Sequence, residues 1–312
     1  MSVISKIRLS LSNIKIDFMR FHKVALVLSV LCIVASLLLV FTKKLNFGID
    51  FAGGVLVEVK IDDAADIADL RSIVDAEIRD AQIQNVSDGS ASEKLFLIRV
   101  AKFKDDDQAV LVKTIQEVIA KKYTKVEYRK IDYVGPQVGS ELIRKGFLAL
   151  FTSLLAIMIY IWIRFDWQFG VGGVFALLHD VFLVLGFYSI SGLEFNLTSI
   201  AAILTVIGYS INDSVVIYDR IRENLAKHKK MALSQLINSS INSTLSRTIL
   251  TSGVTLAAIL ALVIFGGEVL KSFSVATFVG ILIGTYSSIY ISAPILLYFD
   301  PKKKAEEKNG KK

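Results

Sequence analysis

The chain has 312 residues, of which 53% are hydrophobic and three are prolines. Its mean hydropathy of +0.55 excludes an ordinary soluble fold, because a chain of this size cannot bury so much apolar surface. The net charge of +7 is largely explained by basic segments that flank the apolar stretches, where Lys and Arg meet anionic lipid. The charge therefore gives no reason to expect binding to nucleic acid.

Six apolar stretches are each long enough to cross a hydrocarbon core about 30 Å thick. In chain order they are Val24–Phe41, Gly146–Ile163, Gln168–Ile190, Leu197–Tyr218, Ile249–Phe265 and Phe273–Phe299. The sequence therefore predicts a polytopic α-helical membrane protein with six transmembrane helices. The first stretch is expected to stay as an anchor, because two lysines, Lys43 and Lys44, follow it in place of a small-residue cleavage site.

Basic residues in the short loops predict the orientation, since Lys and Arg favour the cytoplasmic side of a membrane. They are dense in residues 1–23, 220–230 and 302–312, whereas loops 191–196 and 266–271 together carry one basic residue. Both termini are thus expected in the cytoplasm. The expected divisions are a cytoplasmic N-terminal segment (1–23), a first transmembrane helix (24–42), a periplasmic domain (43–140), transmembrane helices two to six (141–300) and a basic cytoplasmic tail (301–312).

The segment 43–140 has the pattern of a small α+β domain. Apolar residues alternate in its predicted strands and recur every three or four positions in its predicted helices. The predicted elements are a strand at Gly54–Ile61, a helix at Ala64–Ala81, a strand at Ile83–Val86, a turn at Ser87–Ser90, a strand at Lys94–Ala101, a helix from Asp105 to about Tyr123 and a strand at Lys125–Val134. This βαββαβ order predicts a ferredoxin-like fold, which hosts many functions and identifies none.

Two further patterns concern helix packing. In the last apolar stretch, small residues recur at every fourth position and predict a surface on which another helix packs closely. A contact within the chain is the favoured interpretation, and an interface with a partner protein is the alternative. Before the first stretch, an amphipathic pattern predicts a helix that lies on the lipid of the inner leaflet. The small residues are Ala276, Gly280, Gly284, Ser288 and Ser292, and the amphipathic pattern consists of Ile4, Ile7, Leu11, Ile14, Phe18 and Phe21.

The acid in the fourth apolar stretch, Asp213, is the best indication of function. A charged side chain at the centre of the bilayer costs roughly 2.5–3.5 kcal/mol on insertion scales, so it persists where it faces the interior of a bundle and serves a purpose. Asp213 follows Asn212 and can be a packing residue that bonds to hydroxyl groups such as those of Ser210 or Ser214. It can instead carry or gate an ion.

Other charged residues near the same depth favour the ion-carrying interpretation. Arg247, just before the fifth apolar stretch, is expected to reach the depth of Asp213, and movement of a guanidinium group changes the proton affinity of a nearby acid. Asp180 lies near the middle of the third stretch, beside His179. For His179 a packing role is the simpler interpretation, and a direct role in carrying protons is the alternative.

The sequence shows no motif for metal or nucleotide chemistry. It contains no HExxH or CxxC motif, and its three histidines have no paired spacing. It also lacks the GxxxxGK[ST] loop that holds nucleotide phosphates. We therefore expect neither a cofactor nor nucleotide hydrolysis, so that any work must draw on an ion gradient or on a partner protein.

A series of motifs runs along nearly the whole chain. They are Asn46–Gly54, Val134–Gly139, Ala176–Asp180, Ile207–Asp213, Asp219–Asn224, Ser246–Gly253, Phe265–Gly267 and Gly284–Tyr290. Together they resemble the motifs of the SecF family, which is grouped with SecD in the RND superfamily. The resemblance implies a subunit of the bacterial inner membrane that works in protein export.

The resemblance also implies partners and roles. The partners would be SecD, the SecYEG translocon and YajC, with SecA supplying an earlier ATP-driven step and an unfolded preprotein as the client. The proton gradient would drive the late part of translocation. Asp213 and Arg247 would form the proton relay, and the remaining residues would support it or join the first helix to the domain. The possible supporting residues are Asn212, Asp180, His179 and Asp219, and the joining motif contains Gly48, Asp50, Gly53 and Gly54.

Two other classes of function stay open. An RND-type exporter of small molecules or lipids would share the relay, but it should have a larger outside region than residues 43–140. A structural scaffold of the translocon would not need an ionisable group at position 213. Neutralising Asp213 discriminates between the scaffold and the relay.

Overall fold

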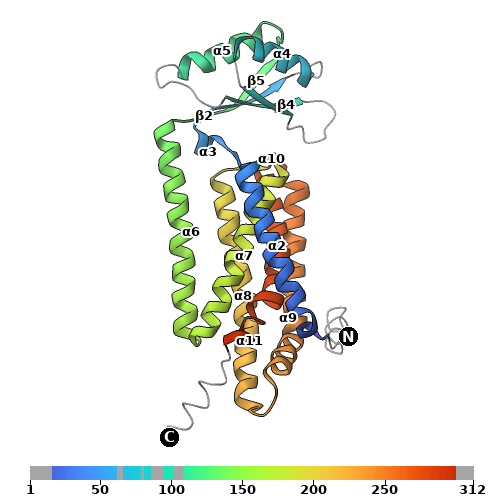
Figure 1. The fold of residues 1–312 in the computed structure, drawn as a ribbon. Coiled ribbons are helices and arrows are strands. Elements are labelled where there is room, and N and C mark those ends of the chain that lie inside the picture. Colours follow the sequence, from blue (N-terminus) through green and yellow to red (C-terminus); the bar gives the residue numbers. More distant parts are fainter. Residues whose placement is uncertain (1–15, 62–65, 79–80, 86–93, 101–107, 300–312) are drawn as a thin grey trace, which may run out of the picture.

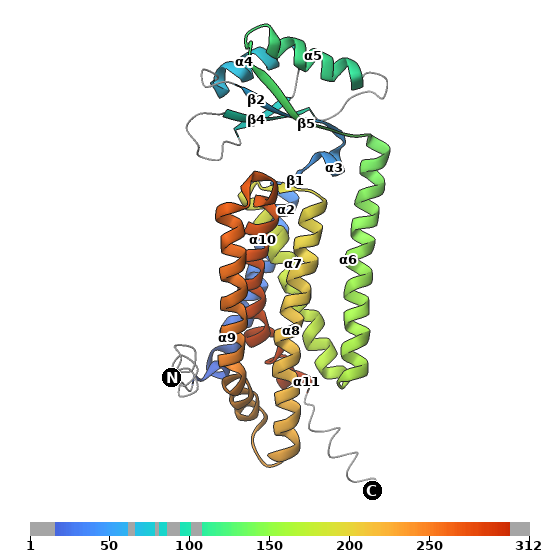
Figure 2. The same cartoon turned by 180° about the vertical axis from the view of Figure 1, so that it is seen from behind.

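The computed structural model describes residues 16–61, 66–78, 81–85, 94–100 and 108–299. Within these ranges the chain forms a bundle of long helices with a small α+β domain at one end (Figures 1 and 2). Four predicted features lie outside the described residues: most of the amphipathic N-terminal segment, the turn at Ser87–Ser90, the acidic run at 105–107 and the basic tail.

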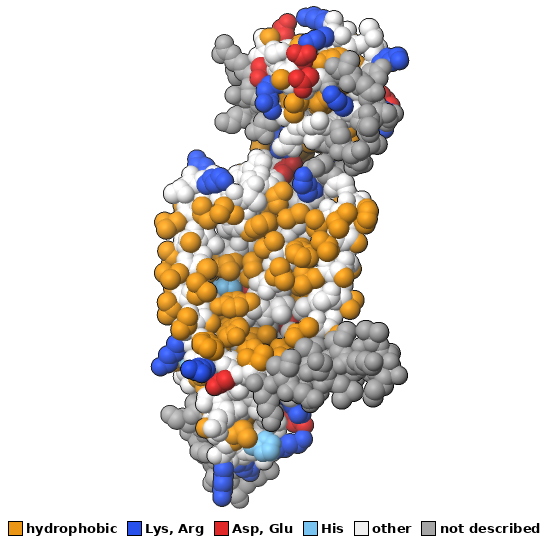
Figure 3. Space-filling model, turned by 90° about the vertical axis from the view of Figure 1, so that its right-hand side faces the viewer, with side chains coloured by type: hydrophobic (Ala, Val, Ile, Leu, Met, Phe, Trp, Pro, Cys, Tyr) orange, Lys and Arg blue, Asp and Glu red, His pale blue; other side chains and the backbone are white. Residues whose placement is uncertain are grey.

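Six helices among the described residues are long and apolar enough to cross a membrane. This confirms the number that the sequence predicts. The helices are α2 (His22–Thr42), α6 (Pro136–Arg164), α7 (Trp167–Ser191), α8 (Leu197–Lys227), α9 (Leu233–Phe265) and α10 (Gly267–Ser287). Their outward side chains form a broad apolar band between two charged rims (Figure 3).

Three helices continue well beyond the predicted spans, since α6 begins at Pro136, ten residues before Gly146, and α8 and α9 are also longer than predicted. Helix α8 has 31 residues and α9 has 33, so at 1.5 Å per residue each is longer than about 45 Å and exceeds the hydrocarbon core. They form a hairpin that projects past the other helices at the end opposite the domain (Figure 1). The fifth helix begins at Leu233, not at Ile249, because polar residues lower the hydropathy of its first turns without interrupting the helix. Arg247 consequently lies inside α9, not in front of it.

The stripe of small residues on α10 packs within the chain, as the favoured interpretation predicts. A side chain added at Gly280 would overlap Val206, and one added at Gly284 would press on Ser210. Both of these neighbours belong to α8, so the absence of side chains allows α8 and α10 to approach closely. Helix α10 ends in a π-helical turn, η2 (Ser288–Ser292), before α11 (Leu296–Phe299). Pro294 explains the break, since its ring cannot continue a regular helix.

The N-terminal segment meets the bundle where its description begins. A short 3₁₀ helix, η1 (Phe18–Phe21), contains Phe18, which is buried against Tyr290. The N–H groups of Ile16 and Phe18 donate to Asn242 and Asn238 of α9 at 2.9 and 2.8 Å. This end of the segment is therefore bound to α9.

The small domain has the ferredoxin-like arrangement. Its elements are β2 (Gly54–Ile61), α4 (Ile67–Glu77), β3 (Ala81–Asn85), β4 (Lys94–Val100), α5 (Gln108–Ala120) and β5 (Val126–Val134). The strands lie in the order β3-β4-β2-β5 with every neighbouring pair antiparallel, and both helices cover one face. The predicted strand at Gly54–Ile61 is confirmed. The predicted first helix is shorter than expected at both ends.

The predicted joining motif between the first helix and the domain also contacts the bundle, through a strand pairing that the sequence did not predict. After α2, β1 (Asn46–Phe47) pairs in parallel with β6 (Glu194–Phe195), which lies between α7 and α8. The short helix α3 (Ile49–Ala52) follows and leads to two glycines with positive φ, 71° at Gly53 and 134° at Gly54. Residues with side chains rarely adopt such angles, so the glycine pair allows the chain to turn from α3 into β2.

We expect Gly53→Ala to lower the stability of the protein by about 1–3 kcal/mol, because φ of 71° with ψ of 164° lies in a region that is essentially reserved for glycine. Thermal unfolding in detergent measures the loss. Gly170→Ala is the matched control, since nothing lies within 4 Å of the added carbon and its φ is not positive. Equal melting temperatures for the two variants would contradict the role assigned to Gly53.

Candidate functional site

Asp213 lies on α8 inside the bundle, with 2% of its surface exposed. Its Oδ2 atom has no hydrogen-bond partner among the described residues. Ser210 and Ser214, which the packing interpretation offered as partners, do not fill this role: Ser210 bonds elsewhere, and Ser214 Oγ has no partner among the described residues. Asp213 is thus a buried acid with one oxygen that no described residue bonds.

Arg247 and Ser252 approach Asp213 from α9. The guanidinium group of Arg247 is close enough for its charge to act on the carboxyl group, and the hydroxyl group of Ser252 also lies within its reach. Arg247 itself is exposed on the side of α9. The structure therefore brings together the two residues that the sequence analysis paired, with the arginine at the open edge of the site.

A second buried acid, Asp180, is fully bonded. Its Oδ1 contacts His179 Nδ1 at 2.9 Å, and its Oδ2 accepts hydrogen bonds from Ser210 Oγ at 2.5 Å and Ser287 Oγ at 2.9 Å. These residues come from α7, α8 and α10, so the acid joins three helices. Asp180 has no exposed surface, and polar groups in a membrane interior require such partners.

His179 extends this network toward α2. Its ring lies beside that of Tyr286, with centroids 6.1 Å apart. The hydroxyl group of Tyr286 donates to the carbonyl oxygen of Ala25 at 3.1 Å and lies 3.0 Å from Ser29 Oγ. His179 Nε2 is buried without a partner among the described residues. The histidine is therefore part of a polar layer that crosses the bundle from α8 to α2.

Ser210 connects the two acids in space. It precedes Asp213 by three residues on α8, so the two side chains lie on neighbouring positions of one face, about 4.5 Å apart along the axis. A movement of α8 that alters the surroundings of Asp213 must also act on the hydrogen bond between Ser210 and Asp180. The sequence analysis overlooked Ser287. Ser287 directly precedes Ser288 of the small-residue stripe, and this position indicates that Ser287 lies close to the helix interface.

The other two candidate residues on α8 do not line the site. Asn212 is exposed and points away from the carboxyl group of Asp213. Asp219 lies six residues, or about 9 Å, further along the helix, where it pairs with Arg164 at 3.7 Å with most of its side chain exposed. The structure thus brings Asp213, Arg247, Asp180 and His179 into one region and leaves Asp219 at the edge of the bundle.

The glycine-rich segment after α2 lies at the outer end of α8. The N–H of Gly48 donates to the carbonyl of Phe195 at 2.9 Å, and a side chain at Gly48 would overlap the carboxyl group of Glu194. Asp50 Oδ2 accepts the N–H of Leu197, the first residue of α8, at 3.0 Å. An acid in this position satisfies a free helix N–H and complements the helix dipole. Gly48 and Asp50 therefore fix the start of the helix that carries Asp213.

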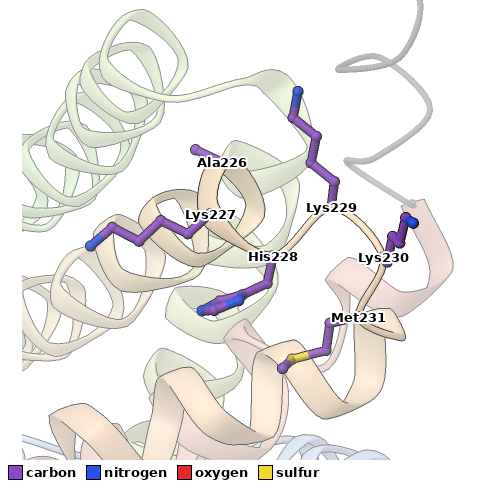
Figure 4. Close-up of a pocket in the computed structure, with 6 residues that line it drawn as sticks. All are labelled: Ala226, Lys227, His228, Lys229, Lys230 and Met231. Carbon is purple, nitrogen blue, oxygen red and sulfur yellow. The ribbon is translucent and has the colours of Figure 1, made fainter.

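A separate cavity of about 450 Å³ lies at the tip of the α8–α9 hairpin, where Lys227, Lys229 and Lys230 point in different directions (Figure 4). It is wide open to the surroundings and far along α8 from Asp213. Among the described residues, no group of three or more His, Cys, Asp or Glu side chains is placed to hold a metal ion. The candidate site is therefore the polar region around Asp213.

Two family models match parts of this chain. The family model of the C-terminal part of SecD/SecF protein export membrane proteins matches residues 114–302, and the SecD/SecF GG motif matches residues 38–65. The first match contains both buried acids and Arg247. The second contains Gly48, Asp50, Gly53 and Gly54.

Individual relatives agree with the family models. The protein translocase subunit SecF of Rickettsia bellii is 50% identical over 299 residues, which cover 95% of this chain and 97% of the relative. SecF of Rickettsia prowazekii is 49% identical, with 94% and 93% covered. The chain belongs to the SecF family.

Two solved structures of SecDF have a fold similar to that of this chain. The crystal structure of SecDF from Thermus thermophilus, described as a translocon-associated membrane protein, matches with a TM-score of 0.82 and 36% identity, and a structure of SecDF in a super-membrane-facing form matches with a TM-score of 0.68 and 37% identity. Each match covers 96% of this chain. The chain spans only 39% of the length of the first SecDF chain and 40% of the second, so SecDF contains a large part that this SecF-family chain does not.

We expect Asp180→Ala to destabilise the bundle by about 1–2 kcal/mol, because it removes two hydrogen bonds between helices, which average about 0.6 kcal/mol each, and the contact with His179 within α7. Unfolding in mixed micelles with increasing SDS measures this loss. Asp219→Ala is the control, since an exposed ion pair contributes about 0–1 kcal/mol. If both variants unfold at the same SDS fraction, Asp180 does not join the helices as described.

Proposed function

We propose that this chain is the SecF-type half of a proton-driven membrane complex that promotes the late translocation and release of preproteins. The observation that carries the proposal is the unused acceptor of the buried Asp213 beside Arg247, in a chain of the SecF family. A buried acid with one oxygen that no described residue bonds has room for a proton, whereas both oxygens of Asp180 are bonded.

The relay follows from the positions of the two charges. With Arg247 near, its positive charge stabilises the ionised form of Asp213; with Arg247 withdrawn, the buried carboxyl group binds a proton instead. Alternation between the two arrangements moves a proton if each faces a different side of the membrane. Each charge that crosses is worth about 2.3 kcal/mol per 100 mV, which supplies work without nucleotide hydrolysis. The chain acts in this proposal as an accessory subunit, and SecA provides the earlier ATP-driven step.

The orientation comes from the basic loops. Positive residues cluster at the tip of the α8–α9 hairpin, and such residues favour the cytoplasm. The ferredoxin-like domain lies at the opposite end of the bundle (Figure 2), and this arrangement together with the basic loops supports a periplasmic position for it in a bacterial inner membrane. Preprotein emerging from the SecYEG translocon, with YajC as an accessory, would meet this domain.

A SecD partner explains polar groups on the membrane face of the bundle. Asn212 and Arg247 are exposed at a depth where other helices present apolar side chains, and nothing lies within 4 Å of a carbon added at Gly208. Polar side chains facing lipid are costly, whereas small and polar residues are typical of helix interfaces. The longer SecDF chains contain additional sequence that could supply the second half of such an interface.

The two alternative functions require different structural features: a large outside region for an exporter, and no ionisable site for a scaffold. An RND-type exporter would bind its cargo in a large outside region, whereas the described outside region is a single four-stranded domain. A scaffold would give no reason for a buried acid at Asp213, with an Oδ2 atom that no described residue bonds, beside a charged arginine. The export experiment below separates the scaffold from the relay.

We expect Asp213→Asn to abolish gradient-dependent export while the protein stays inserted and bound to its partner, because asparagine keeps the size of aspartate but cannot titrate. Arg247→Met should have nearly the same effect, since it removes the charge that controls the acid. Export of a preprotein into vesicles containing SecYEG, SecA and the SecD partner, with and without a proton gradient, measures both effects.

Asp219→Asn is the control for this experiment, because Asp219 lies outside the site and should retain the response to the gradient. Vesicles with the chain but without its SecD partner should show no response. Wild-type rates and normal gradient dependence for both Asp213→Asn and Arg247→Met would establish the scaffold in place of the relay.

For the orientation, we expect an impermeant maleimide to label Lys113→Cys in intact spheroplasts and to leave Lys227→Cys unlabelled. Both positions are well exposed, with 76% and 61% of their side-chain surface accessible, and they lie at opposite ends of the molecule. Cys32→Ser provides a background without other thiols. Both variants should react after permeabilisation. Labelling of Lys227→Cys alone in intact cells would invert the topology.

A further inference from the structure

One acidic residue, Glu194, joins the domain to the membrane bundle at the start of α8. Its carbonyl oxygen accepts hydrogen bonds from Ser199 Oγ of α8 at 3.1 Å and from Ser272 Oγ of α10 at 2.6 Å. Its side chain forms an ion pair with Arg99 of β4. Glu194 therefore bonds at once to two central helices and to the sheet of the domain.

Arg99 occupies the face of the sheet that the domain helices leave open. Its neighbours Ile98 and Val100 are buried in the domain core, and because side chains alternate along a strand, Arg99 projects from the opposite face. Only 5% of its side chain is exposed. An arginine so far removed from water needs a counterion, and Glu194 is the acid that the structure provides.

Two further bonds hold this junction to α8. Asp50 accepts the first N–H of the helix, and Asn196 caps it by accepting the N–H of Ser199 at 3.2 Å. The same helix carries Asp213 sixteen residues further on, about 24 Å along its axis. An α-helix is stiff over this distance, so a displacement of α8 at the depth of Asp213 also displaces its outer end.

We infer that Arg99 and Glu194 are a positioning pair that carries the movement of α8 into the extramembrane domain. This inference rests on the proposed function, because it assigns the path by which a change at Asp213 reaches the domain. β4 is one of the two inner strands of the sheet. A side chain anchored there moves the sheet as one body, whereas an anchor on a loop would move the loop alone.

The test compares variants that keep the shape of the junction but remove its charges. Arg99→Met combined with Glu194→Met replaces the ion pair with apolar side chains, a change that is often neutral for stability when both partners are replaced. Lys130→Met combined with Asp132→Met is the matched control, because that pair lies 2.5 Å apart on the same sheet but is solvent-exposed. If the first double variant fails to assemble, Glu194→Gln takes its place.

The readout is the distance between spin labels on Lys113→Cys in the domain and Leu270→Cys at the outer end of the bundle. The distance is measured in vesicles, in the complex with the SecD partner and in a Cys32→Ser background. Each variant is measured with Asp213 intact and again with Asp213→Asn. Export with and without a proton gradient is measured in parallel on the unlabelled variants.

We expect Asp213→Asn to shift the distance distribution in the parent and in the control, and the shift to be lost in the Arg99→Met, Glu194→Met variant together with gradient-dependent export. A shift that persists in that variant overturns the inference. If Asp213→Asn abolishes export but shifts no distance in the parent, the inference fails while the proposed function stands. If Asp213→Asn changes neither export nor distance, both fail.

Discussion

A carboxyl group inside a membrane bundle must find its hydrogen-bond donors on neighbouring helices, and Asp180 finds them on its own helix, on α8 and on α10. Lipid provides no driving force like the hydrophobic effect between helices, so close packing and such bonds decide which helices lie together. The glycines of α10 permit the close approach to α8, and the bonds of Asp180 fix the register at which it occurs. The position of every polar group on α8 follows from this register.

Asp213 differs from Asp180 in its partners and not in its burial. Both acids are almost fully enclosed, yet one has each oxygen bonded and the other has an oxygen with no partner among the described residues. The bonded acid stabilises one arrangement of the helices. Asp213 faces α9, a helix that is far less buried than α8 and that carries the exposed charge of Arg247. Ser210, which bonds to Asp180 of α7, and Asp213 lie within one turn of α8, so the two acids meet the same part of that helix.

The sequence predicted much of this arrangement because membrane helices and alternating strands have strong periodic signals. The number of spans and the order of the ferredoxin-like elements follow from such signals, and the pairing of Asp213 with Arg247 follows from the expected depth of the two residues. The limits of α8 and α9 did not, since hydropathy reports where a helix meets lipid and not where it ends. The partners of Asp180 could not be predicted either, because Ser210 and Ser287 are distant in sequence and meet only through helix register. The junction at Glu194 involves two-residue strands, which are too short for any periodic signal.

Helix α8 connects the junction with the domain to the buried acids and to the hairpin with α9. Its first turn is bonded to Asp50 and Glu194, its middle presents Ser210 and Asp213, and its last turns continue into the hairpin with α9. Because no proline interrupts α8, its backbone hydrogen bonds resist a local kink. Under the proposed relay, α8 therefore shifts or turns as a body. Such a shift would alter both the contact of Asp213 with α9 and the position of Glu194, so one rigid helix would link the acid to the domain.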